Sequence, residues 1–229
     1  MPGLSNAAPR RERTYPFPPY PNSWYAVAWS HDVPAGPSRP AHYFGRDLVV
    51  FRGQDGVARV LDAVCPHLGA HLGVDSKVVN NTIECPFHAW RFDGTGQCVA
   101  IPYRKNIPGK AQVKSWPVSE VNGHILVYFH VDNAAPEFQV PPMPGFLDPD
   151  WTTPSFHTVD VRTHVQEMNE NIFDFAHFVY IHHFARLPEH TIDIDGPHVK
   201  VQLDGAGLVM GREVDTSTTN YMHGAGCTV

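Results

Sequence analysis

The sequence contains few cysteines, no long apolar run and no excess of positive charge. Four cysteines in 229 residues are too few for a disulfide-stabilised scaffold, so we expect reduced thiols and a cytoplasmic location. No apolar run approaches the roughly 18–20 residues that cross a bilayer, so we expect no membrane segment. The formal net charge of −6 argues against nucleic acid and anionic membranes as partners, because both bind basic surfaces. Imidazole, in contrast, is plentiful, with 15 histidines.

The distribution of prolines and turn residues predicts two domains. Residues 1–23 are rich in proline and are predicted to form an extended arm. Residues 24–135 alternate short β-branched or aromatic runs with turn motifs, and are predicted to form an all-β domain. Residues 136–151 contain five prolines and are predicted to be a linker. Over residues 152–229 the pattern changes, and we expect the start of an α+β domain.

The expected elements follow from local periodicity. In the first domain, strands are predicted at residues 24–29, 47–52, 58–64, 90–92, 98–101, 113–118 and 124–131. In the second domain, we expect a strand at 157–165, a mostly helical segment at 166–184 and a β-hairpin within 198–214. The last residues, YMHGAGCTV, carry neither a helix stop nor a closing strand pattern, so we expect this domain to be incomplete.

Two short loops of the first domain each pair one cysteine with one histidine. Cys65 and His67 lie in CPHLG, and Cys85 and His88 lie in CPFH, with seventeen residues between the two pairs. Structural zinc sites usually take both cysteines from one half and both histidines from the other, so zinc is the less favoured alternative. Two thiolates and two imidazoles divided between loops suit a two-iron cluster, in which one iron has sulfur ligands and the other nitrogen ligands.

On these motifs, residues 24–131 resemble the Rieske family. The resemblance implies an iron–sulfur β-sandwich whose [2Fe–2S] cluster is held by Cys65, His67, Cys85 and His88. Respiratory-chain members carry an extra cysteine in each loop, where this sequence has Ala70 and Phe87. The loops are therefore more similar to those of Rieske ferredoxins and oxygenases. Cys98 and Cys227 lie outside the loops and are interpreted as ordinary thiols.

A second group of candidate metal ligands lies in NENIFDFAHFVYIHHF. Here Asp174, His177 and His182 form the pattern D-x-x-H-x-x-x-x-H. On an ideal helix Asp174 and His177 lie about 60° apart, close enough for a carboxylate to orient an imidazole. His177 and His182 lie about 140° apart, too far to share a metal, so we expect the helix to break or bulge within residues 179–181. From the spacing alone, ordinary core or surface histidines remain an alternative.

After a Rieske domain, this pattern resembles the helix-grip catalytic domain of Rieske non-haem iron oxygenases. The resemblance implies a mononuclear Fe(II) held by His177, His182 and a carboxylate, with open positions for O₂. It also implies that Asp174 hydrogen-bonds to His177 and, across a subunit boundary, to His88 of a neighbouring copy. The full-length protein would then be a homotrimer. An NAD(P)H-dependent reductase or a ferredoxin would supply the electrons.

Three longer stretches, residues 21–30, 65–103 and 110–130, resemble the group of cholesterol 7-desaturases and bacterial 3-ketosteroid 9α-hydroxylases. The implied substrate is a sterol or steroid that is hydroxylated or desaturated, and an aromatic compound is the alternative substrate. The rival functions are a Rieske electron-transfer protein, which needs only residues 24–131, and a truncated, non-catalytic remnant.

The third iron ligand departs from the resemblance. Relatives supply this carboxylate from a later helix, which we expect to lie beyond Val229. The carboxylates after His182 form no recognisable motif: Glu189, Asp193, Asp195, Asp204, Glu213 and Asp215. We therefore expect residues 1–229 alone to bind iron weakly and to turn over little substrate.

Overall fold

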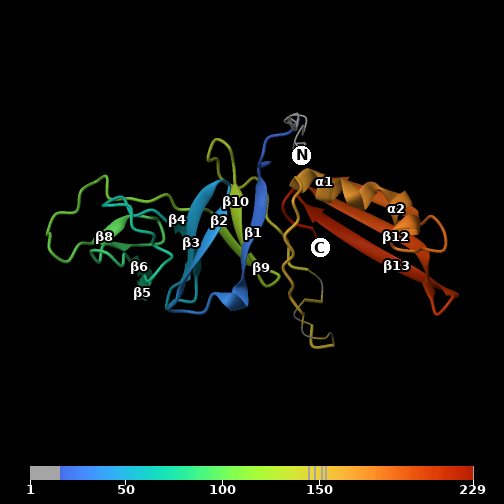
Figure 1. The fold of residues 1–229 in the computed structure, drawn as a ribbon, viewed down its shortest axis with the longest axis horizontal. Helices are drawn as coiled ribbons and strands as arrows, with labels where there is room; N and C mark the ends of the chain where they lie inside the picture. Colours follow the sequence, from blue (N-terminus) through green and yellow to red (C-terminus); the bar gives the residue numbers. More distant parts are fainter. Residues whose placement is uncertain (1–15, 144, 147, 151, 153, 229) are drawn as a thin grey trace, which may run out of the picture.

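The computed structural model describes residues 16–143, 145–146, 148–150, 152 and 154–228. The prediction of an extended arm therefore falls mainly on residues that are not described. Figure 1 shows an elongated molecule, in which a group of small sheets occupies one end and a long hairpin with short helices occupies the other. No helix of the described residues is long and apolar enough to span a bilayer.

The first domain consists of three small antiparallel sheets. The sheet with strand order β1-β10-β9 contains β1 Ser23–Trp29, β9 Val118–Val121 and β10 His124–Phe129. The sheet β2-β3-β4 contains β2 Ser38–Tyr43, β3 Arg46–Arg52 and β4 Ala58–Asp62. The sheet β5-β6-β7-β8 contains β5 Lys77–Val79, β6 Thr82–Glu84, β7 Arg91–Phe92 and β8 Cys98–Ala100. The 3₁₀ helix η1, Ser30–Asp32, follows β1.

Strand β3 separates two hydrophobic cores. Its residues Leu48, Val49, Val50 and Phe51 are all fully buried, and alternate side chains point to opposite faces. Leu48 and Val50 pack with the sheet that contains β1 and β10, whereas Val49 and Phe51 pack with the residues around the two Cys/His loops. A strand buried on both faces needs a continuous apolar run, which explains LVVF in the sequence. The residues around the two Cys/His loops therefore pack against a strand that is held in place on both faces.

The second domain places short helices beside a three-stranded sheet. The helices are α1 Val165–Glu170, the 3₁₀ helix η2 Asn171–Phe173 and α2 Phe175–Tyr180. The sheet has the order β11-β12-β13, with β11 Glu189–Asp195, β12 His198–Val209 and β13 Arg212–His223. Figure 1 shows both α-helices running alongside β12. A Cβ at Gly205 would lie 2.9 Å from the Phe184 ring, so this glycine lets the segment after α2 pack on β12.

The last described residues pack back against the first strand. The Gly226 amide donates to Ser23 Oγ at 3.2 Å, and Cys227 contacts a buried cluster that includes Trp24. A Cβ at Gly226 would lie 2.1 Å from the Trp24 carbonyl oxygen, so only glycine allows this approach. The side-chain amide of Asn169 in α1 also donates to the carbonyl of Ala225, at 2.8 Å. The two domains therefore contact each other at β1.

Six of the seven strands predicted in the first domain are present, whereas β2, β5, β6, β9 and β11 were not predicted. The strand predicted at 113–118 is wrong: these residues form one isolated bridge, at Ser115, before β9 begins at Val118. The strand predicted at 157–165 is wrong: these residues have no regular structure before α1 begins, because their alternating pattern has no neighbouring strand to pair with among the described residues. The predicted helical segment 166–184 is interrupted at Asp174 and ends at Tyr180. The predicted hairpin exists but is longer, since it turns at residues 210–211.

A pair of hydrogen-bonded histidines joins the ends of β12 and β13. His198 and His223 are cross-strand partners, and their Nδ1 atoms lie 2.9 Å apart, so that one ring donates and the other accepts. Burial lowers the pKa of His223, and the nearby His198 lowers this pKa further. Both effects disfavour a positive charge on His223 in the folded protein.

Because the pKa of His223 is lowered in the folded protein, we expect the protein to lose stability in acid. Below pH about 6.5, the usual histidine pKa, the unfolded chain binds a proton that folded His223 does not. The contribution of His223 to stability is therefore complete above that pH and is lost as the pH falls toward the lower folded pKa. We expect the melting temperature to drop over this range and a His223→Gln variant to show a shallower drop. The exposed control His157→Gln should keep the wild-type slope, and an equal flattening in both variants would contradict the assignment.

Candidate metal centres

The first Cys/His loop closes through main-chain hydrogen bonds. The Cys65 amide donates to the carbonyl of Ala70, and the Gly69 amide donates back to the carbonyl of Cys65, both at 2.9 Å. Gly69 has a φ of 78°, which glycine adopts without strain. The tight turn leaves the cysteine at its base and His67 near its tip.

The second loop repeats this closure. The Cys85 amide donates to the carbonyl of Trp90 at 2.8 Å, and the Ala89 amide donates back to the carbonyl of Cys85 at 3.0 Å. Ala89 occupies the position of Gly69 and also has a positive φ, 55°. The same turn is therefore used twice, with histidine two residues after the first cysteine and three residues after the second.

The four predicted cluster ligands lie together between these turns. Cys65 and Cys85 are 2% and 3% exposed, whereas His67 and His88 are half-buried, with ring centroids 4.6 Å apart. Burial raises the pKa of the Cys65 thiol to about 11, and contact with Cys85 also raises it. A buried thiol keeps its proton unless a nearby cation stabilises the thiolate. A metal centre here would provide that positive charge.

The donor atoms fit a two-iron cluster. The Nδ1 atom of His88 is buried and has no hydrogen-bond partner within the described part of the chain, although such atoms normally have one. A metal bound at Nδ1 would satisfy it. Among the same residues, no three His, Cys, Asp or Glu side chains gather closely enough to ligate one ion. Two sulfurs and two imidazoles so arranged suit two irons with two ligands each better than one tetrahedral zinc.

Aromatic side chains support both histidines. The His67 ring stacks on Trp90, with centroids 4.5 Å apart and planes inclined by 11°. Trp90 Nε1 donates to the Tyr103 hydroxyl at 2.7 Å, and the Phe87 ring lies 4.0 Å from the His88 ring. Stacking fixes a ring plane and thereby the direction of its nitrogens. The roles of Trp90 and Tyr103 could not be predicted from the sequence, because Trp90 follows His88 in sequence but contacts the histidine of the other loop.

Asp174 lies at the break between η2 and α2. It is the N-cap of α2, with φ −85° and ψ 80°, and it is exposed. Its carbonyl oxygen, rather than its carboxylate, contacts Nδ1 of His177. Because a carbonyl can only accept, His177 carries its proton on Nδ1, which leaves Nε2 available as a metal ligand. The orientation expected from the Asp174 carboxylate is thus provided by the main chain.

The break expected between the two candidate iron ligands is present. Helix α2 ends at Tyr180, and the His182 amide donates to the carbonyl of His177 at 3.3 Å, an i→i+5 contact of the π type. The ring centroids of His177 and His182 consequently lie 5.0 Å apart. The structure therefore brings together two side chains that a regular helix would point in different directions.

No carboxylate completes this second centre within the described residues, since no third acidic or other metal-binding side chain joins the two histidines. The six carboxylates after His182 lie on the sheet of the second domain. Arg186 forms ion pairs with Glu213 and Asp215, at 3.4 and 3.0 Å. The two histidines are suited to hold an iron only as part of a larger ligand set.

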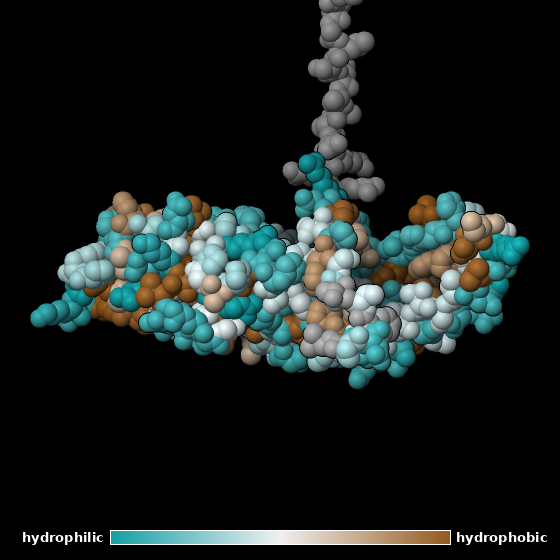
Figure 2. Space-filling model, turned by 90° about the horizontal axis from the view of Figure 1, so that it is seen from below, coloured by the Kyte–Doolittle hydropathy of each residue, from teal (hydrophilic) through white to brown (hydrophobic). Residues whose placement is uncertain are grey.

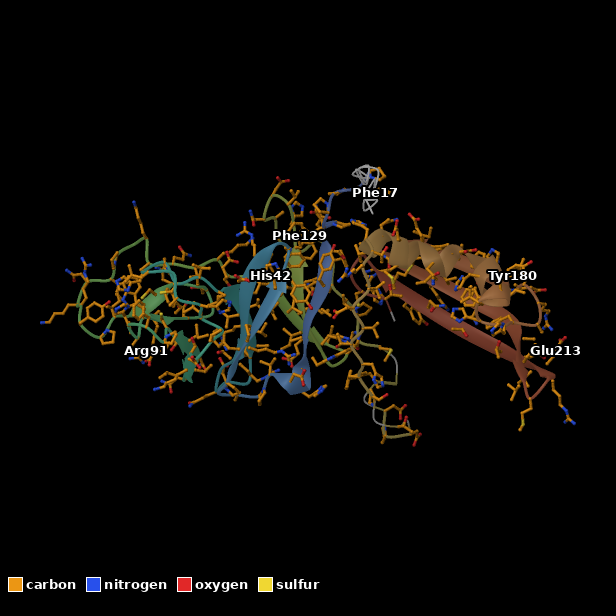
Figure 3. The ribbon with its side chains drawn as sticks, in the orientation of Figure 1. Phe17, His42, Arg91, Phe129, Tyr180 and Glu213 are labelled. Atoms are coloured by element: carbon orange, nitrogen blue, oxygen red, sulfur yellow. The ribbon has the colours of Figure 1, made fainter. Side chains whose placement is uncertain are left out.

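The two candidate centres lie at opposite ends of the molecule. Figure 1 shows the sheet β5–β8 at one end and α2 at the other, and in Figure 3 the labelled residues Arg91 of β7 and Tyr180 of α2 mark these ends. A contact between Asp174 and His88 would therefore require two copies of the chain.

Two protein families match the sequence. Residues 23–117 match the Rieske [2Fe-2S] domain, and residues 127–229 match the 3-ketosteroid 9alpha-hydroxylase C-terminal domain. Cholesterol 7-desaturase nvd 1 of Ciona intestinalis is 41% identical over 165 residues, which are 72% of this chain and 35% of that protein. The probable 3-ketosteroid-9-alpha-monooxygenase oxygenase component of Rhodococcus rhodochrous is 40% identical over 167 residues, which are 72% of this chain and 42% of that protein. The chain thus spans about two fifths of the length of these relatives.

Solved structures share the fold. Dicamba monooxygenase with non-heme iron and dicamba is 23% identical, with a TM-score of 0.68 over 89% of this chain and 62% of that chain. NdmB of Pseudomonas putida CBB5 is 21% identical, with a TM-score of 0.68 over 86% of this chain and 68% of that chain. The predicted fold class, an iron–sulfur β-sandwich followed by the start of a helix-grip domain, is confirmed.

Proposed function

Because the chain belongs to the Rieske oxygenases, in the group of the cholesterol 7-desaturases and 3-ketosteroid 9α-hydroxylases, we propose that it acts in the oxidation of a sterol or steroid. The cofactors of this family are a [2Fe–2S] cluster and a mononuclear non-haem iron. The observation that carries the proposal is that one chain contains both the doubled Cys/His turn and the histidine pair at the π-type turn after α2. An electron carrier would need only the first.

The proposed roles follow from the positions of the side chains. The cluster ligands would be Cys65, His67, Cys85 and His88, and the iron ligands would be His177 and His182. When bound, the cluster supplies a one-electron store and the mononuclear iron supplies the chemistry that activates O₂ toward a C–H bond. The protein's own contribution is placement. Burial keeps water from the cysteine sulfurs, stacking on Trp90 fixes the plane of the His67 ring, and the Asp174 carbonyl keeps the His177 proton on Nδ1.

The exposed carboxylate of Asp174 is proposed to act between subunits. On this proposal it accepts a hydrogen bond from His88 of a neighbouring copy in a homotrimer, and so couples one subunit's cluster to the next subunit's iron. The placement of the two centres at opposite ends of the chain supports this role. An NAD(P)H-dependent reductase or a ferredoxin is the proposed electron donor.

Iron content tests the two centres separately. We expect anaerobically reconstituted protein to hold two irons tightly and a third weakly, because the third has only two histidine ligands among the described residues. A His177→Ala variant should lose the third iron and keep the visible absorption and EPR signal of the cluster. The control His183→Asn changes a neighbouring exposed histidine, whose φ of 57° asparagine tolerates, and should keep all three. A wild-type protein that never exceeds two irons would instead support a Rieske electron-transfer protein or a non-catalytic remnant.

Product analysis tests the substrate class. With NADPH, an electron-transfer chain and O₂, slow conversion of cholesterol or a 3-ketosteroid is expected, detected by mass spectrometry as one added oxygen or two lost hydrogens. The names of the relatives that share about 40% identity support this class. Oxidation of an aromatic compound, with the steroids unchanged, would contradict it.

A further inference from the structure

A cavity of about 310 Å³ lies where the two domains meet. Its walls come from β1 and β10 of the first domain, from segments within residues 140–156 and from the last described residues. Figure 1 shows the segment that joins the domains, in yellow, running beside β1 with the C-terminus close by. Pockets that bind small molecules occur preferentially between domains and have volumes of roughly 300–1,000 Å³. The size and the position of this cavity are therefore those of a ligand site.

The lining of the cavity is largely apolar. Its aliphatic side chains include Ala26, Leu126, Val140 and Met143, and no Lys, Arg, Asp or Glu occurs among the described residues that line it. Burial raises the pKa of the Cys227 thiol, which also lines the cavity and stays neutral. In Figure 2, brown and paler residues occur in the middle of the molecule as well as at its ends. A charged ligand would lose its hydration here without gaining an ion pair, so the cavity favours a neutral molecule.

Three aromatic rings form one wall of the cavity. The centroid of the Trp29 ring lies 4.6 Å from that of His124 and 4.7 Å from that of Phe156. Trp29 Nε1 also donates to the hydroxyl of Thr158 at 3.2 Å. A Cβ at Gly123 would lie 3.0 Å from the Phe156 ring, so this glycine leaves room for the ring. Because flat aromatic systems stack on one another, such a wall suits a ligand of fused rings.

His124 supplies a hydrogen-bond acceptor to this wall. Its Nδ1 lies 2.8 Å from the carbonyl oxygen of Asn122, and because a carbonyl can only accept, the neutral ring carries its proton on Nδ1. Nε2 can then only accept, and it has no partner among the residues that the structure describes. The side-chain amide of Asn122 is used twice, since it donates to the carbonyl of Pro141 and accepts from the amide of Met143. A ligand hydroxyl would supply the donor that His124 Nε2 lacks.

We propose that this interdomain cavity binds a neutral fused-ring molecule that carries a hydroxyl group. The rings of the molecule pack between the aromatic wall and the aliphatic side chains, and its hydroxyl donates to Nε2 of His124. None of the candidate ligands of the two metal centres lines the cavity. The site is therefore separate from the iron at which the proposed function places the oxidation, and it does not depend on that function.

Binding of 2-naphthol tests the proposal. The compound is titrated calorimetrically into the reconstituted wild-type protein, the Ala26→Phe variant and the control Ala134→Phe. Ala26 is exposed and lines the cavity, so phenylalanine there fills the cavity without entering the buried core, whereas Ala134 is exposed and lies outside the cavity lining. We expect one molecule to bind per chain. Its affinity should fall by about tenfold or more in Ala26→Phe and stay within about twofold of the wild type in Ala134→Phe.

The hydrogen bond to His124 has a test of its own. 2-Methoxynaphthalene has the same rings as 2-naphthol but no donor, and a His124→Phe variant keeps an aromatic ring but has no Nε2. The ratio of the two affinities, 2-naphthol over 2-methoxynaphthalene, should be about two- to tenfold lower in His124→Phe than in the wild type, which is the size of one hydrogen bond. An unchanged ratio would show that the hydroxyl does not donate to His124 and would overturn its assignment.

The possible outcomes separate this proposal from the proposed function. If the wild type shows no saturable binding, the cavity holds only water and the proposal is overturned. Equal affinities of Ala26→Phe and the wild type would also overturn it, because the compound would then bind elsewhere. The His177→Ala variant should bind 2-naphthol as the wild type does, and a loss of binding there would place the compound at the second metal centre and contradict the interdomain site. None of these titrations requires iron or turnover, so failure of the proposed function would leave their result unchanged.

Discussion

A Cys85→Ser variant is expected to be purified without its [2Fe–2S] cluster. Cys85 is 3% exposed and lies at the base of the second turn, next to Cys65. A serine hydroxyl is a poor ligand for iron in a sulfur-rich centre, because soft thiolates are the preferred ligands of iron–sulfur clusters. The visible absorption, the EPR signal of the reduced protein and the acid-labile sulfide should all fall to the background level.

Cys98→Ser is the matched control for this loss. Cys98 is equally buried and belongs to the same hydrophobic core, but it lies on β8 outside the loops, and its Sγ donates to the carbonyl of Ala100 at 3.6 Å. This variant should lose some stability and keep the cluster. Retention of the cluster by Cys85→Ser, or zinc in place of iron in the wild type, would show that the two loops do not hold a Rieske centre.

A Gly96→Ala variant is expected to lose about 3 kcal/mol of folding free energy. Gly96 has a φ of 81°, and a Cβ there would lie 2.0 Å from the carbonyl oxygen of Val113. Val113 in turn donates its amide to the carbonyl of Gly96 at 2.9 Å, so neither backbone can move away without loss of this hydrogen bond. The turn precedes β8, which pairs with β7 directly after the second Cys/His loop. Chemical denaturation of the cluster-free and cluster-loaded protein would measure the change.

Gly45→Ala separates the contact from the backbone strain. Gly45 has a comparable φ of 66°, but nothing lies within 4 Å of the position of its Cβ. This variant should lose about 1 kcal/mol, from the unfavourable φ alone. Equal losses in the two variants would mean that the contact with Val113 is relaxed at no cost.

The candidate cluster ligands could be identified from the sequence because all four lie in short, recognisable motifs. Cys65, His67, Cys85 and His88 lie in turns whose closure depends on residues at most five positions apart. Trp90 and Tyr103 could not be assigned in this way, since their roles come from a stack and a hydrogen bond between separate segments. The role of the Asp174 carbonyl was also missed, because sequence patterns report side chains and not main-chain oxygens.

Strands with strong apolar patterns were predicted correctly, and weakly patterned strands were not. β3 and β10 have nearly continuous apolar runs, which buried strands require. β2 contains a proline, and β11 has only a short alternation of Ile192 and Ile194 with aspartates, in which every residue is exposed, so neither strand was predicted. Residues 157–165 show the opposite case, in which alternation occurs without a partner strand. A strand is stabilised by pairing with neighbouring strands, and its own residues do not show which strands these are.

Both Cys/His turns close through main-chain atoms alone. Replacing the histidine side chain of a turn therefore has a different consequence from changing the length of the turn. A different side chain at the position of His67 or His88 leaves every closing hydrogen bond in place, since none of these bonds involves an imidazole. Removal of one peptide unit between the cysteine and the closing carbonyl would break both bonds of that turn and shift the donor out of reach. On the proposed ligand assignment, single substitutions at His67 or His88 would change the ligands of one iron without opening the turn, while the number of residues in each turn has to stay constant.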